Sequence, residues 1–128
     1  MSIENIEIIE SPDNANYVEY VVTHDDGSRG YTDLRIMELD EDHHMHRLLN
    51  KGLPSGSKIA EIFFYPHSST TQHGQGVGSR VLDAVLNDAQ ERGVRAVYSQ
   101  VTNTIAERFF RKRGFDKCYE LEYYKVLS

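Results

Sequence analysis

The sequence predicts an α/β (α+β) domain in which strands come first and two strand–helix units follow. Short runs that alternate apolar and polar residues occupy the first third of the chain, and from Val77 onward the apolar residues recur at helical spacing. A chain of 128 residues with 39% hydrophobic and 10% aromatic content can bury a core. We therefore expect a single domain over residues 1–128.

The first half of the chain is predicted to consist mainly of strands. A hairpin turn is expected at Asp25-Asp26-Gly27, and residues 41–51 fit one short helix that ends before Gly52. The strands are predicted from alternation and from β-favouring residues over 3–9, 17–23, 31–39 and 59–65. The last of these should be a central strand.

Two helices are predicted in the second half. The first ends at Gly93 and buries a stripe made of Val77, Val81, Leu82, Val85 and Ala89. The second follows a strand over 94–101, is capped by Asn103 and stops at Gly114. Its expected buried face consists of Ile105, Ala106, Phe109 and Phe110. Alternation over 119–127 predicts a final strand.

Charge and composition exclude several classes of protein. The net charge of −6 argues against general nucleic-acid binding, which needs a basic face. The acidic run at Glu38 and 40–42 could attract a lysine-rich peptide or could be a solvated loop. No apolar stretch is long enough to span a bilayer and no leader pattern is seen, so we expect a soluble, cytoplasmic protein. Cys118 is better explained as a small apolar residue in a strand than as a nucleophile.

The histidines at 43, 44 and 46 form a local cluster that could bind a metal ion. Neither an H-E-x-x-H pattern nor a cysteine pair accompanies them. We therefore expect no metal site.

A glycine-rich turn lies between the central strand and the helix that follows. It reads His73-Gly74-Gln75-Gly76-Val77-Gly78-Ser79. Glycines allow a phosphate to approach the backbone, and N–H groups at the start of a helix favour an anion. The spacing matches neither the P-loop nor the dinucleotide pattern G-x-G-x-x-G. An ordinary tight connection is the alternative.

Two motifs in this order resemble the GNAT superfamily of acyl-CoA N-acyltransferases. The turn resembles the family's pyrophosphate loop, with His73 in place of the usual Gln or Arg. The segment Asn103–Phe115 resembles the pattern Asn-x-x-Ala-x-x-aromatic-aromatic-x-x-x-Gly-Phe. The resemblance implies the GNAT fold, a mixed central sheet of about six or seven strands flanked by helices, and acetyl-CoA as cosubstrate. The implied cofactor-binding residues are Phe64, Tyr65, His73, Gly74, Gln75, Gly76, Val77, Gly78, Ser79, Asn103, Phe109 and Phe110.

Glu61 interrupts the apolar central strand. A carboxylate there could be desolvated, which would raise its pKa and suit a general base, or it could face solvent. The stretch from Ala60 to Gln72 is similar to the catalytic core of the PCAF-type histone acetyltransferases. That resemblance implies Glu61 as general base and the backbone N–H of Tyr65 as oxyanion donor. Phe110 stands where many family members have a tyrosine acid.

We therefore expect an N-acetyltransferase that acts on a primary amine. A lysine of a protein or peptide is the leading acceptor, and a small amine is the chief rival. A non-catalytic CoA-binding module and a small α/β interaction domain remain alternative functions. A homodimer is a possible assembly.

Overall fold

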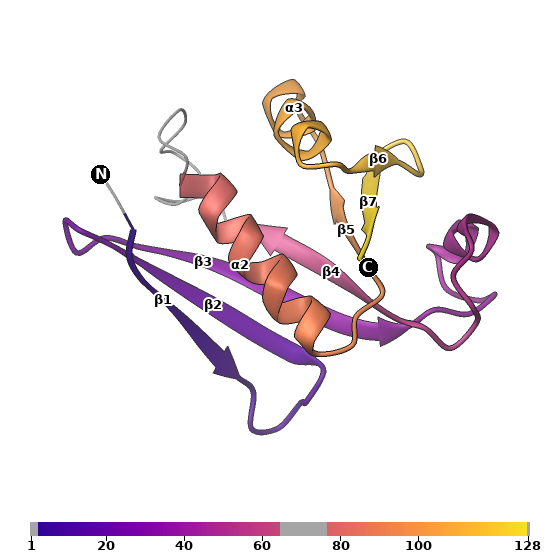
Figure 1. Ribbon diagram of the computed structural model, residues 1–128, viewed down its shortest axis with the longest axis horizontal. Coiled ribbons are helices and arrows are strands. Elements are labelled where there is room, and N and C mark those ends of the chain that lie inside the picture. Colours follow the sequence, from indigo (N-terminus) through magenta and orange to yellow (C-terminus); the bar gives the residue numbers. More distant parts are fainter. Residues whose placement is uncertain (1–2, 65–76, 128) are drawn as a thin grey trace. The chain divides into compact units, whose positions relative to one another are not determined.

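The structure is a computed structural model that describes residues 3–64 and 77–127. Its elements in chain order are β1 (Ile3–Glu10), β2 (Tyr17–His24), β3 (Arg29–Glu38), the 3-10 helix η1 (His46–Lys51), β4 (Lys58–Phe64), α2 (Val77–Glu91), β5 (Ala96–Gln100), α3 (Thr104–Lys112), β6 (Asp116–Lys117) and β7 (Glu122–Val126), as Figure 1 shows.

The strands form one mixed sheet in the order β1-β2-β3-β4-β5-β7-β6. β4 and β5 are parallel, and the pairs β1–β2, β2–β3, β5–β7 and β6–β7 are antiparallel. The predicted fold class is confirmed, and β4 is central as expected. The chain divides into two compact units, one made of residues 1–35 and 62–89 and the other of residues 36–61 and 90–128.

The first unit is built on the β2–β3 hairpin, which closes at the predicted turn. The N–H of His24 donates to the carbonyl of Ser28 at 2.9 Å, and Gly27 has a φ of 86°, which glycine adopts without strain. The Tyr20 hydroxyl of β2 donates to the Asp88 carboxylate of α2 at 2.5 Å. The buried side chains of β2 and α2 include Val18, Tyr20, Val22, Val81, Leu82, Val85 and Ala89. The predicted stripe of α2 is confirmed within its described side chains.

The second unit has its core on one face of β4 and β5. The segment 39–53 packs there, and the buried cluster consists of Leu39, Met45, Leu48, Leu53, Ile59, Ala96 and Tyr98. The helix expected over 41–51 is instead a short 3-10 helix over His46–Lys51. The N–H of His46 donates to the carbonyl of His43, and the N–H of Leu48 donates to the carbonyl of Met45. This is the three-residue spacing of a 3-10 helix. It ends at Gly52, with a φ of 93°.

The second predicted helix forms as α3, but one expected core residue is wrong. Ile105 is 63% exposed, whereas Phe110 is 4% exposed and its ring meets that of Phe115 at 4.9 Å. Successive residues are turned by about 100° in a helix. Only the side of α3 that carries Phe110 therefore faces inward. The final strand is also shorter than the predicted 119–127.

None of the helices within residues 3–64 and 77–127 has the length and apolar character to cross a bilayer.

Candidate functional site

Glu61 and Tyr98 lie side by side on neighbouring strands. The parallel register of β4 and β5 pairs them directly. The Tyr98 hydroxyl donates to Oε1 of Glu61 at 3.5 Å. Glu61 is half-buried and Tyr98 has no exposed surface, so the carboxylate is neither fully desolvated nor free on the surface.

Tyr98 is held in its protonated form. Burial raises the pKa of its phenol above the usual value, and the neighbouring Glu61 carboxylate and the charge of Glu122 raise that pKa further. A phenol in this state remains a hydrogen-bond donor across the physiological pH range. Tyr98 is therefore better suited to donate to a carboxylate than to release its proton.

Two histidines and a methionine surround the Tyr98 side chain. The rings of His43 and His44 stack at 4.7 Å and meet the Tyr98 ring edge-on at 6.2 and 5.5 Å. The Tyr98 hydroxyl is also 3.6 Å from Sδ of Met37, and Nε2 of His43 is 3.0 Å from the same sulfur. Burial and the nearby His44 lower the pKa of His43, so its ring is neutral near pH 7.

The second motif places its residues on α3 as expected. Oδ1 of Asn103 accepts from the N–H of Ala106 at 2.8 Å, which confirms the predicted cap. Phe110 is buried, Phe109 is half-buried, and the two rings lie 5.3 Å apart. The capped turn therefore fixes where Asn103 and the two phenylalanines sit on the second unit.

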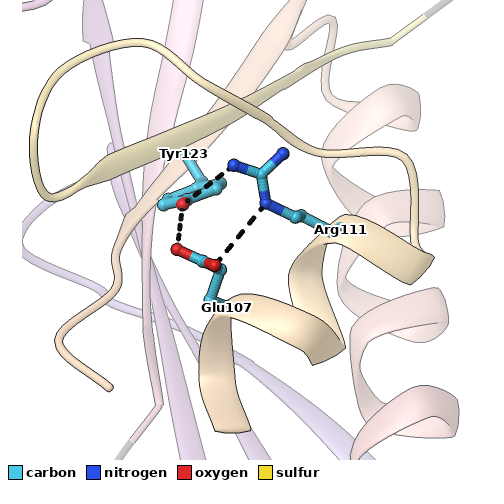
Figure 2. Close-up of polar contacts among 3 residues, drawn as sticks. All are labelled: Glu107, Arg111 and Tyr123. Atoms are coloured by element: carbon cyan, nitrogen blue, oxygen red, sulfur yellow. Dashed lines mark hydrogen bonds and ion pairs between the residues drawn. The ribbon is translucent and has the colours of Figure 1, made fainter. Parts of the chain in front are cut away.

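A polar triad joins α3 to β7, as Figure 2 shows. The buried Tyr123 hydroxyl donates to Oε2 of Glu107, and Arg111 donates to the Tyr123 oxygen at 3.3 Å. Arg111 also lies 3.8 Å from the Glu107 carboxylate, and its guanidinium lies over the Tyr123 ring at 5.2 Å. The hydrogen bond to Glu107 raises the pKa of Tyr123.

Much of the glycine-rich turn lies outside the part of the chain that the structure describes. Tyr65, His73, Gly74, Gln75 and Gly76 lie outside the described residues, as do the side chains of Phe64 and Val77. Phe64 ends β4, and Gly78 and Ser79 lie in the first turn of α2 with both half-buried. The cradle for a diphosphate stays a prediction.

Sequence reasoning identified Glu61 but missed most of its surroundings. Met37 approaches Tyr98 from β3 and His43 approaches it from the segment 39–53, and no spacing in the sequence predicts either contact. The strand predicted over 94–101 places Tyr98 in the sheet but does not predict its pairing with Glu61. Within residues 3–64 and 77–127, no three side chains of the metal-binding types gather as a metal site.

Comparisons with known proteins agree with the fold. Residues 68–115 match the model of the Acetyltransferase (GNAT) family. NAA60 of Arabidopsis thaliana, solved in complex with acetyl-CoA, is 16% identical, with a TM-score of 0.65 over 90% of this chain and 77% of that chain. A search of curated proteins finds no match.

Two other solved structures show the same fold. Ribosomal-protein-alanine N-acetyltransferase from Brucella melitensis is 19% identical, with a TM-score of 0.61 over 87% of this chain and 69% of that chain. Arylalkylamine N-acetyltransferase 2 from Aedes aegypti is 14% identical, with a TM-score of 0.60 over 86% of this chain and 73% of that chain. The architecture built from β4, β5 and the two helices is therefore the GNAT fold.

Proposed function

We propose that this chain, which matches the GNAT family model over residues 68–115 and has the GNAT fold, transfers the acetyl group of acetyl-CoA to a lysine of a protein or peptide. Glu61 is the general base of this proposal. The observation that carries it is the half-buried Glu61 carboxylate, paired with a protonated tyrosine on the neighbouring parallel strand.

Acetyl-CoA as cosubstrate is supported by the family match and by the solved complex of NAA60 with acetyl-CoA. In this chain, the described residues that would contact its diphosphate include Gly78 and Ser79, in the first turn of α2. Backbone N–H groups at a helix start suit a diphosphate.

The chemistry that Glu61 would perform begins with a proton. A lysine amine has a pKa near 10.4, so it arrives mostly as an ammonium ion. The Glu61 carboxylate takes one proton from nitrogen, and the freed lone pair attacks the carbonyl carbon of the thioester. The carbon–sulfur bond then breaks, and a second proton from nitrogen goes to the departing thiolate. The products are an acetylated amine and free CoA thiol.

The acidic run supports a cationic acceptor. Asp40, Glu41 and Asp42 are exposed, and they lead directly into His43 and His44, whose rings contact Tyr98. The second unit thus brings negative charge close to the face that carries Glu61. Such a field attracts a lysine-rich segment and weakens as salt is added.

An acceptor screen tests the proposal. Thiol release from acetyl-CoA is followed with a lysine-rich peptide, with a peptide whose only amine is an N-terminal alanine, and with phenethylamine. We expect the lysine peptide to give the highest kcat/KM. Turnover of phenethylamine alone would indicate that the acceptor is a small amine. Absence of thiol release with every amine would favour a CoA-binding module.

A charge variant provides the matched control. Neutralising the acidic run with Asp40→Asn, Glu41→Gln and Asp42→Asn should raise the KM of the lysine peptide several-fold at low salt. The KM of uncharged acceptor analogues and of acetyl-CoA should change less than twofold. An equal KM for the lysine peptide in both proteins would contradict the electrostatic part of the proposal.

A further inference from the structure

The Tyr98 hydroxyl has two acceptors but only one proton. Oε1 of Glu61 lies at 3.5 Å and Sδ of Met37 at 3.6 Å. A hydroxyl donates one hydrogen bond at a time. Distances of this length are common for catalytic groups before substrate binds. The proton of Tyr98 can therefore point either to the carboxylate or to the thioether.

His43 biases that choice. The backbone N–H of Met45 donates to Nδ1 of His43 at 2.9 Å, so the neutral ring carries its proton on Nε2. Nε2 lies 3.0 Å from Sδ of Met37, so it can donate this proton to the sulfur. The sulfur is a weak acceptor that already takes one hydrogen bond, from His43, and an ionised carboxylate is the stronger acceptor of the two.

We propose that Tyr98 is a positioning residue that holds the ionised Glu61 carboxylate by a hydrogen bond and turns its proton to Met37 once Glu61 is protonated. This inference rests on the proposed function of Glu61 as base. Tyr98 exchanges no proton with the substrate. Its hydroxyl only rotates, so the chemical balance of the acyl transfer is unchanged.

Among the described residues, charged and titratable groups reach this pair from two further parts of the second unit, the segment after β3 and strand β7. His43 and His44 reach Tyr98 from the segment after β3, with Asp40 acting on His43. Glu122 acts on Tyr98 from β7. All of these groups are retained in the variants below, so a change in Glu61 titration reports on Tyr98 and Met37.

Opposite shifts in two variants distinguish this role from simple packing. Tyr98→Phe removes the donor that favours the charged carboxylate, so the pKa of Glu61 should rise by about one unit. Met37→Leu removes the competing acceptor at nearly constant volume, so the pKa of Glu61 should fall. Tyr20→Phe is the matched control, because it also removes a buried tyrosine hydroxyl bonded to a carboxylate, in the first unit. It should leave the Glu61 titration unchanged.

The test is a ¹³C NMR titration of glutamate side-chain carboxyls, with the Glu61 signal assigned by its loss in Glu61→Gln. It needs no turnover, so failure of the proposed enzyme activity and failure of this inference are separate results. In an active enzyme, the acid limb of kcat/KM should move with the same signs, and the KM of acetyl-CoA should change less than twofold.

Two results would overturn the inference. One is a Glu61 titration that is the same in Tyr98→Phe as in the unmodified chain. The other is a shift of the same sign in Tyr98→Phe and Met37→Leu, which would indicate a general disturbance of packing. Circular dichroism of each variant confirms that the fold is retained, and Tyr98→Leu repeats the loss of the hydroxyl if Tyr98→Phe does not fold.

Discussion

The Tyr123 hydroxyl of β7 donates a hydrogen bond to the Glu107 carboxylate of α3, and Arg111 contacts both groups. This triad ties α3, which Asn103 caps and which carries Phe110, to β7 of the sheet (Figure 2). The position of α3 therefore depends on three polar side chains as well as on the contact between Phe110 and Phe115.

Removing the central hydroxyl should loosen α3. Tyr123→Phe keeps the ring but removes the hydroxyl that donates to Glu107, so we expect a lower midpoint of urea unfolding and a several-fold higher KM for acetyl-CoA. Tyr119→Phe is a matched control, since this tyrosine contacts Arg47 instead of α3. An unchanged midpoint and KM in Tyr123→Phe would show that the apolar contacts alone position the helix.

The Asn103 cap gives a second prediction. Asn103→Ala leaves the N–H of Ala106 without its partner and should destabilise the chain by about 1 kcal/mol. Asn103→Ser should restore most of that loss, because serine also caps helices well. Urea unfolding followed by circular dichroism measures both. Equal stability of the alanine and serine variants would contradict a capping role.

His24 gives a prediction of the opposite sign. It has no exposed surface, and within the described part of the chain neither ring nitrogen has a hydrogen-bond partner. Buried polar atoms without partners are costly, so His24→Phe should raise the free energy of unfolding by about 1 kcal/mol. If His24→Phe instead lowers the free energy of unfolding by more than about 1 kcal/mol, measured with urea at pH 7, the imidazole has an essential partner.

The raised pKa of Tyr98 predicts how stability falls in alkali. A free tyrosine loses its proton near pH 10, while the folded protein keeps the Tyr98 proton to higher pH. Above about pH 10 the unfolded chain therefore binds fewer protons than the folded chain. The contribution of Tyr98 to the free energy of unfolding is fully present below about pH 10 and falls above it, by at most about 1.4 kcal/mol per pH unit. The free energy of unfolding should fall less between pH 9 and pH 11 in Tyr98→Phe than in the unmodified chain. An identical drop would mean that Tyr98 ionises normally in the fold.

Local chemistry made much of the fold predictable. Asn103 caps α3, Gly27 turns the β2–β3 hairpin, and Gly93, with a φ of 84°, follows the end of α2. Each of these depends on residues a few positions apart. The error at Ile105 arose because an apolar pattern does not say how wide the buried stripe of a short helix is.

The contacts of the site depend on register and on long-range packing. Glu61 could be singled out because a carboxylate is unusual in an apolar strand. Its pairing with Tyr98 follows from the parallel alignment of β4 and β5, and the approach of His43 follows from the path of residues 39–53. Neither is encoded in a local pattern, so both emerged only from the structure.

The most direct test of the account is turnover and cosubstrate binding in Glu61→Gln, which keeps the shape of the side chain and removes the base. We predict that kcat for the preferred amine falls by about 10²- to 10³-fold at pH 7, while the Kd of acetyl-CoA measured by calorimetry stays within about twofold. A kcat within about threefold of the unmodified chain, with acetyl-CoA still bound, would contradict Glu61 as the general base.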